Sequence, residues 1–179
     1  LATGKKNYVS EKFDSNVEGF VWNKDNKSLS FIGVWHGTLN LYQANFKGEV
    51  KQITNEWADY GSISLANNGN KLLATKASMS HPTDIYIVTP GKDAKSTKVE
   101  QITRENDHIL NQLNLGKCEQ RWVKTTDGKQ MLVWIMLPSN FDANKKYPTL
   151  LFCEGGPQSP VSQFWSYRWN IQIMAANGY

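Results

Sequence analysis

The feature that most constrains the fold of this chain is an internal repeat in its first 104 residues. Three pairs of segments match in their order of apolar positions and polar turns: 22–31 with 65–74, 40–43 with 84–87, and Gln52-Ile53-Thr54 with Gln101-Ile102-Thr103. The unit therefore repeats after roughly 45 residues. Short β-prone runs, separated by Asn, Asp, Gly and Lys, predict four strands in each unit.

A period of this length with four short strands per unit is typical of the blades of a β-propeller. Two blades alone would leave both outer faces in water, because blades bury their faces against neighbours around a ring. Either further blades lie upstream or the array is an unusual sandwich, and the first interpretation is favoured. We therefore expect a fragment, in which residues 1–104 form the C-terminal part of a propeller.

A different pattern follows the repeat. Residues 105–117 are polar and predict a linker. Two β-rich runs, 121–126 and 129–137, are joined by Asp127-Gly128, which predicts a hairpin with a type I′ turn. The apolar run 149–153 shows no alternation, which predicts a strand buried on both faces of an α/β sheet.

This run leads into Glu154-Gly155-Gly156-Pro157, where the glycines permit positive φ and close approach of a ligand. Trp165, Trp169 and Ile173 then recur at four-residue spacing and predict a helix that stops at Asn177-Gly178. Hairpin, strand, glycine loop and helix in this order predict that residues 118–179 begin an α/β domain.

Composition excludes several classes of protein. The chain is 40% hydrophobic and 20% charged, as in ordinary globular proteins. Its net charge of +4 comes from scattered bases, which argues against nucleic-acid binding. No apolar run is long enough to span a membrane. The chain starts at Leu1, so any targeting signal was removed or was never part of it.

Cys118 and Cys153 have no zinc-like spacing to each other or to the histidines, so we expect no metal. Cys153 ends the predicted buried strand and is expected to be a small apolar filler, which leaves the redox compartment undecided.

Several motifs together resemble one known family. They are Thr126-Asp127-Gly128, residues 137–142, Lys146-Tyr147-Pro148, residues 155–159 and residues 174–179. In this order they resemble the start of the catalytic domain in the prolyl oligopeptidase family of serine peptidases. The dipeptidyl peptidase and acylaminoacyl peptidase branches are the most similar, and in them a β-propeller precedes an α/β-hydrolase domain.

The resemblance implies a serine exopeptidase, without cofactor, that releases dipeptides or acylated residues from the N-terminus of short peptides. It also implies a secreted or periplasmic parent protein and is compatible with a homodimer. The family's Ser, Asp and His come in that order, with Ser in a G-x-S-x-G turn. That turn is not in this sequence, since Gly61-Ser62-Ile63-Ser64 lacks the second glycine. We therefore expect the triad after Tyr179 and an inactive fragment, in which His36 and His81 are structural.

The resemblance also implies that residues 154–157 lie beside the nucleophile and supply an oxyanion donor. In some branches a tyrosine hydroxyl at the first position does this, but here that position is Glu154. An ionised carboxylate cannot donate and would repel the oxyanion. Either the backbone N–H of Gly155 or Gly156 is the donor, which we favour, or Glu154 binds the substrate's amino terminus.

The aromatic residues Phe164, Trp165, Tyr167 and Trp169, which surround Arg168 in the sequence, allow two interpretations. Its members could pack as the core face of a helix, or they could line a substrate pocket, for which Trp165 and Arg168 are the better candidates because they lie nearest the glycine loop.

Two other functions compete with an exopeptidase. An esterase can also carry a glycine-rich catalytic loop, although repeats directly upstream argue against it. The parent could instead be a propeller-based peptide-binding protein with a degenerate hydrolase domain, for which Glu154 is the hint.

Overall fold

The structure, a computed structural model, describes residues 4, 6, 8–67, 69–153 and 159–179. The predicted glycine loop, Glu154 to Pro157, lies outside these residues. The elements are β1 (Val17–Trp22), β2 (Ser28–Trp35), β3 (Thr38–Asn45), β4 (Val50–Gln52), β5 (Asp59–Leu65), β6 (Leu72–Ser78), β7 (His81–Thr89), β8 (Lys98–Gln101), α1 (Asp107–Leu110), β9 (Lys117–Lys124), β10 (Gln130–Leu137) and α2 (Ile171–Ala176).

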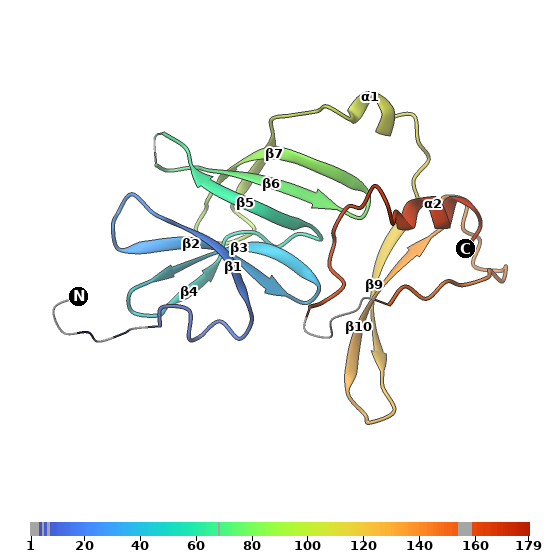
Figure 1. The fold of residues 1–179 in the computed structure, drawn as a ribbon, viewed down its shortest axis with the longest axis horizontal. Helices are drawn as coiled ribbons and strands as arrows, with labels where there is room; N and C mark the ends of the chain where they lie inside the picture. The colour runs from blue at the N-terminus through green and yellow to red at the C-terminus, as the bar shows by residue number, and fades with distance from the viewer. Residues whose placement is uncertain (1–3, 5, 7, 68, 154–158) are drawn as a thin grey trace.

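The repeat forms two antiparallel meanders. Strands β1 to β4 pair in chain order, as do β5 to β8, and Figure 1 shows the two groups side by side. A single parallel pair, Leu39 with Asp59, joins β3 to β5. The prediction of two units with four strands each is confirmed.

Corresponding turns in the two meanders share a closing hydrogen bond and a left-handed residue. In the first, the N–H of Asn23 donates to the carbonyl of Ser28, and Asn26 has a φ of 53°. In the second, the N–H of Ala66 donates to the carbonyl of Lys71, and the left-handed position is Gly69 with a φ of 71°. Asn and Gly tolerate this conformation best, which explains why polar turns mark the repeat in the sequence.

The two meanders bury one shared core. Alternate residues of a strand face opposite sides of its sheet, and Ile32 of β2 therefore faces the second meander while Phe31 faces away from it. The shared core contains Ile32, Leu41, Ile53, Tyr60, Leu72, Ala74 and Val88. On the outer face Phe31 packs with Tyr42 and Ala44, and Phe13 of the N-terminal segment covers them.

Strands β9 and β10 form the predicted hairpin, with Lys124 opposite Gln130. The predicted type I′ turn is wrong. Gly128 has a φ of 83°, but Asp127 is not among the non-glycine residues with positive φ. The N–H of Gly128 donates to Thr125, and the N–H of Thr125 donates to Lys129, which makes a three-residue loop with one left-handed residue.

The predicted buried strand at 149–153 is also wrong for the described chain. Residues 149–153 have no strand conformation, and no described strand pairs with them. Leu151 is 84% exposed, and Cys153 is exposed and is therefore no apolar filler. A strand needs a neighbour to satisfy its backbone groups, and β9 and β10 pair only with each other in the part of the chain that is described.

The predicted C-terminal helix is shorter than its aromatic spacing suggested. Helix α2 begins only at Ile171, because the side chain of Asn170 accepts a hydrogen bond from the N–H of Gln172 and caps it. Trp165 and Trp169 precede this cap and lie in irregular chain. Asn177 ends the helix, as predicted, and Gly178 follows with a φ of 89°.

Candidate functional site

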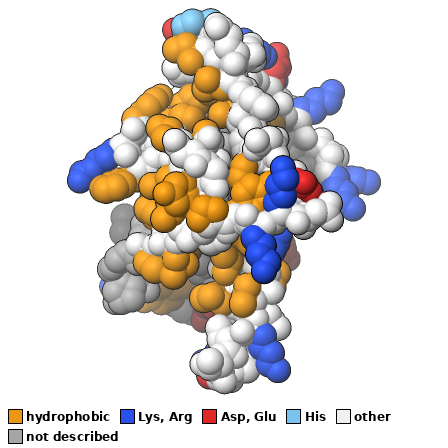
Figure 2. All heavy atoms as spheres, turned by 90° about the vertical axis from the view of Figure 1, so that its right-hand side faces the viewer, with side chains coloured by type: hydrophobic (Ala, Val, Ile, Leu, Met, Phe, Trp, Pro, Cys, Tyr) orange, Lys and Arg blue, Asp and Glu red, His pale blue; other side chains and the backbone are white. Residues whose placement is uncertain are grey.

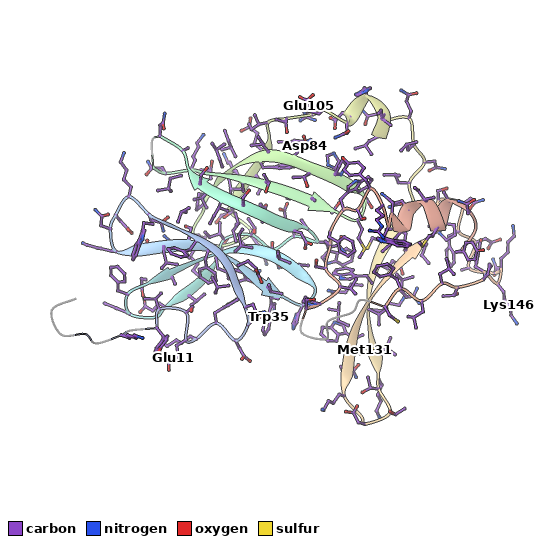
Figure 3. The ribbon with its side chains drawn as sticks, viewed as in Figure 1. Glu11, Trp35, Asp84, Glu105, Met131 and Lys146 are labelled. Carbon is purple, nitrogen blue, oxygen red and sulfur yellow. The ribbon has the colours of Figure 1, made fainter. Side chains whose placement is uncertain are left out.

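Several described contacts join the meanders to the C-terminal third of the chain. The turn between β2 and β3 points at the hairpin, and Trp35 at its start is labelled in Figure 3. The indole N–H of Trp134 donates to the carbonyl of Gly37 at 3.2 Å. The ring of His36 stacks on Trp35 and meets Trp122 edge-on, with ring centroids 4.5 and 5.2 Å apart. His36 lies in the turn between β2 and β3 and packs in a contact between elements.

A second contact joins Asp59, at the start of β5, to Ser162 and Gln163, which follow the glycine loop in the sequence. The hydroxyl of Ser162 donates to Oδ2 of Asp59 at 2.6 Å, and the backbone N–H of Gln163 donates to Oδ1 at 3.1 Å. The N–H of Leu39 donates to the same Oδ1 at 3.3 Å. Burial raises the pKa of Asp59, and these hydrogen bonds act in the opposite direction.

The side chain of Gln163 extends this contact to the turn between β6 and β7. Gln163 is only 2% exposed, and its Oε1 accepts a hydrogen bond from the N–H of Met79 at 3.5 Å. Its Nε2 lies 3.5 Å from Sγ of Cys118. Burial raises the pKa of the Cys118 thiol, which keeps it protonated at neutral pH and makes it a poor nucleophile.

Gln172 joins three segments in the same region. Its Oε1 accepts from the N–H of Gly116 at 2.7 Å, and its Nε2 donates to Oγ of Ser80 at 2.9 Å and to the carbonyl of Gly116 at 3.2 Å. Gln172 is 5% exposed, so these bonds satisfy a buried amide. Helix α2, the linker and the β6–β7 turn are thereby held together.

Trp165 and Arg168, the predicted pocket residues, have different surroundings. Trp165 is half-buried and lines a cavity of about 10 Å³, room for about one water molecule, together with Met79, Phe164, Ser166, Trp169, Asn170 and Ile171. Its buried Nε1 has no hydrogen-bond partner among the described residues. Arg168 does not line this cavity; it is exposed, with its guanidinium 5.2 Å from the centre of the Trp169 ring. A substrate pocket at these residues stays a prediction.

Three potential metal ligands, His81, Asp84 and Asp107, approach one another beside α1. Nε2 of His81 lies 3.6 Å from Asp107, and its Nδ1 is 2.8 Å from the carbonyl of Pro82. Asp84, labelled in Figure 3, is 3% exposed and already accepts hydrogen bonds from Gln101 and Thr103. These contacts describe a polar link between β7 and α1.

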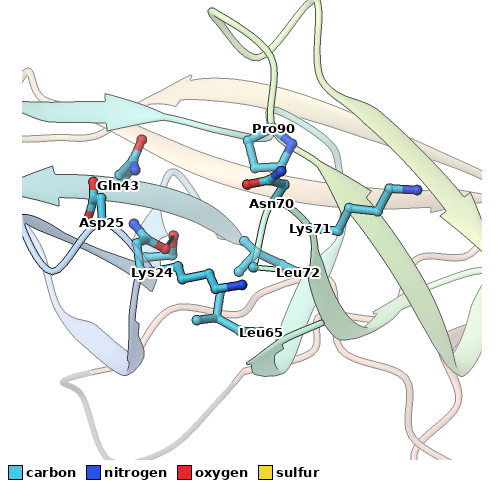
Figure 4. Close-up of a pocket in the computed structure, with 11 residues that line it drawn as sticks. Lys24, Asp25, Gln43, Leu65, Asn70, Lys71, Leu72 and Pro90 are labelled. Atoms are coloured by element: carbon cyan, nitrogen blue, oxygen red, sulfur yellow. Dashed lines mark hydrogen bonds between the residues drawn. The ribbon is translucent and has the colours of Figure 1, made fainter. Parts of the chain in front are cut away.

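A larger cleft, of about 390 Å³, lies between the turns of the two meanders at the opposite strand ends (Figure 4). Three of its polar residues from the first meander bond to the hydroxyl of Ser28: Asn23 and Gln43 donate to it, and Asp25 accepts from it. The residues that line the cleft take no part in the contacts around Asp59 and Gln172.

Hydrophobic side chains gather on the face formed by the hairpin and the C-terminal segment, as Figure 2 shows. Several large ones in this third of the chain are exposed: Trp122, Leu150, Leu151, Tyr167, Trp169 and Ile173. No described helix is long and apolar enough to cross a membrane.

The sequence did not reveal Asp59, Gln163 or Gln172 as site residues. The hydrogen-bond partners of their side chains are 56 to 104 positions away, apart from Leu39 and Cys118, and no local spacing signals such contacts. The predicted donors Gly155 and Gly156, with Glu154, lie outside the described residues.

Comparison with known proteins gives the chain its family. It is 44% identical to dipeptidyl-peptidase 5 of Porphyromonas gingivalis over 180 residues, which cover 100% of this chain and 25% of that protein. It is 47% identical to dipeptidyl-peptidase 5 of Porphyromonas endodontalis over 153 residues, which cover 85% of this chain and 21% of that protein. The chain thus spans about a quarter of the length of these curated relatives.

In fold, the chain is similar to the acylaminoacyl peptidase of Pyrococcus horikoshii, with a TM-score of 0.76 at 21% identity, over 98% of this chain and 26% of that one. No protein-family model matches the chain. The sequence relatives and the fold agree with the motifs of residues 118–179, and the chain belongs to the prolyl oligopeptidase family of peptidases.

Proposed function

We propose that the protein containing this chain is a serine-type exopeptidase, secreted or periplasmic, that releases dipeptides or acylated residues from the N-terminus of short peptides. The similarity to dipeptidyl-peptidase 5 of P. gingivalis along the whole chain carries this proposal. In it, residues 1–104 are blades of a propeller, residues 105–117 are the linker, and residues 118–179 begin an α/β-hydrolase domain. The shared core of the two meanders supports the first assignment, because blades pack face to face.

In the proposed chemistry, this chain supplies hydrogen-bond donors that stabilise the oxyanion of the reaction. A serine nucleophile beyond Tyr179 attacks the scissile carbonyl, and the negative charge that develops on its oxygen needs nearby donors. The backbone N–H groups of Gly155 and Gly156 are the proposed donors, since an ionised side-chain carboxylate at Glu154 can only accept hydrogen bonds. Loss of one oxyanion donor in such enzymes costs about 100- to 1,000-fold in kcat.

An activity-based probe tests the proposal. A fluorophosphonate reacts with an activated serine, so the whole protein should be labelled, and it should release the dipeptide from a dipeptidyl-coumarin substrate. Residues 1–179 alone should not be labelled, because they contain no G-x-S-x-G turn. Labelling of this fragment would contradict the second expectation.

The same assay separates the competing functions. An esterase would hydrolyse a simple ester and leave the amide bond of the dipeptidyl-coumarin substrate intact. A propeller-based binding protein with a degenerate hydrolase domain would bind peptide without labelling or turnover. Either result from the whole protein would overturn the exopeptidase.

A further inference from the structure

Asp59 occupies an unusual position, because in the described chain it forms the parallel strand pair that links β3 of the first meander to β5 of the second. Its backbone pairs with Leu39 of β3, and its carboxylate reaches residues more than 100 positions later in the chain. It therefore touches both meanders and the segment that leads away from the glycine loop.

The carboxylate of Asp59 is held by neutral donors. No lysine, arginine or histidine of the described chain forms an ion pair with it, although burial disfavours its charged form. A partly buried carboxylate is costly unless hydrogen bonds replace its hydration. Three donors do so here, and two of them, Ser162 and Gln163, are consecutive residues.

Ser162 and Gln163 are held by hydrogen bonds to two separate parts of the meanders, at Asp59 and at Met79. Both are buried, at 9% and 2% exposure, in a stretch without helix or strand. Asp59 takes one hydrogen bond from each of them, while Oε1 of Gln163 takes one from the N–H of Met79 in the next turn. An irregular segment has no ladder of its own to fix it, so these contacts determine where it runs.

We propose that Asp59 is a positioning residue for the peptidase reaction: it fixes the chain just after the glycine loop, at Ser162 and Gln163, against the meanders. This inference rests on the proposed function. Asp59 acts through the segment it holds and touches no reacting atom. A catalytic group displaced by about 1 Å can lose about 100-fold in rate, so an anchor of this kind affects kcat.

The test uses the whole protein and a dipeptidyl-coumarin substrate. Asp59→Ala removes all three hydrogen bonds and should lower kcat by about 10- to 100-fold, with KM changed less than about threefold. Asp59→Asn keeps an acceptor for the N–H of Gln163 and should recover most of this loss. Ser162→Ala removes one bond and should fall between Asp59→Ala and wild type.

A matched control separates positioning from folding. Asp93 is an exposed carboxylate that bonds Ser96 within its own turn, so Asp93→Ala should leave kcat unchanged. Circular dichroism and the melting temperature show which variants are folded, and the rate of fluorophosphonate labelling reports on the nucleophile without the substrate pocket. Slower labelling by folded Asp59→Ala supports the proposal.

Two results would overturn it. If folded Asp59→Ala or, should that variant not fold, Ser162→Ala keeps its kcat within about twofold of wild type, Asp59 is merely structural. If only KM changes, the anchor serves binding and the proposal is wrong. A wild-type protein that neither cleaves the substrate nor reacts with the probe would instead refute the proposed function itself.

Discussion

The indole nitrogen of Trp134 lies 3.2 Å from the carbonyl oxygen of Gly37 and fastens the β9–β10 hairpin to the first meander. The contact depends on close approach at Gly37, where an added Cβ would lie 2.7 Å from that same nitrogen. The ring of Trp57 meets Trp134 edge-on at 5.3 Å and extends the contact. The hairpin is thus attached at a turn where the residue in contact with Trp134 has no room for a side chain.

Gly37→Ala should destabilise the protein through both its backbone and this contact. Gly37 has a φ of 67°, and Gly48 is a matched control with a φ of 74° and open space around its Cβ position. Gly48→Ala should therefore cost only the left-handed strain, about 1 kcal/mol. Gly37→Ala should cost about 1 to 3 kcal/mol more, because Trp134 and the backbone at Val161 must shift. Denaturant unfolding measures both, and equal losses would show that the hairpin contact tolerates the extra atom.

The turn at His36-Gly37 shows which features of the fold a sequence pattern can predict and which it cannot. The meanders could be predicted, because their polar turns and apolar alternation are local properties that recur in both units. The two-residue turn with positive φ at both positions is His36-Gly37, whereas Asp127-Gly128 had the expected sequence for it. Asp127 instead accepts hydrogen bonds from Thr125 and Lys129, which stabilise a three-residue loop.

The site could be predicted only in part, because its contacts join distant residues. Asp59 and Gln163 are paired across 104 positions, and nothing near either residue indicates it. The run 149–153 was expected to be a strand from composition alone, but pairing is decided by neighbours. Trp165 and Trp169 had helical spacing, yet the cap at Asn170 starts the helix after them.

Gln172→Leu should destabilise the protein although the replacement has a similar size. It leaves the N–H of Gly116 and the hydroxyl of Ser80, both partly buried, without the buried amide that they bond to. An unsatisfied buried group costs about 1 to 3 kcal/mol. Gln112→Leu is the control, since Gln112 is exposed and its side chain donates to the carbonyl of His108, and the effect of this change on stability should stay within about 0.5 kcal/mol. Similar losses in the two variants would mean that the bonds of Gln172 add nothing.

Stability should depend on pH through Asp59. Burial raises its pKa above the ordinary 3.8, so the folded state binds this proton more tightly than the unfolded state. Its contribution is fully present below about pH 4 and is lost as pH rises through the raised pKa. The melting temperature of wild type minus that of Asp59→Asn should therefore increase on acidification from about pH 7 to about pH 4.

Asp93 gives the opposite sign and serves as the control for this pH series. The hydroxyl and N–H of Ser96 lower the pKa of Asp93, so its contribution is present above about pH 4 and is lost as pH falls through the lowered value. The difference between wild type and Asp93→Asn should therefore shrink in acid. A difference for Asp59→Asn that also shrinks would contradict the assignment of a raised pKa.

Removal of one hydroxyl from each of two buried tyrosines should have unequal effects. The hydroxyl of Tyr60 donates to the carboxylate of Glu56 at 2.5 Å, whereas that of Tyr42 only accepts a long contact of 3.4 Å from Gln52. Burial, with help from Glu56, raises the pKa of Tyr60, so this donor keeps its proton at any working pH. A hydrogen bond to a charged group contributes about 1.5 to 3 kcal/mol, and Tyr60→Phe should lose most of it. Tyr42→Phe should lose less than about 1 kcal/mol, and the reverse order in denaturant unfolding would show that Lys76, 3.3 Å from Glu56, suffices to hold that carboxylate.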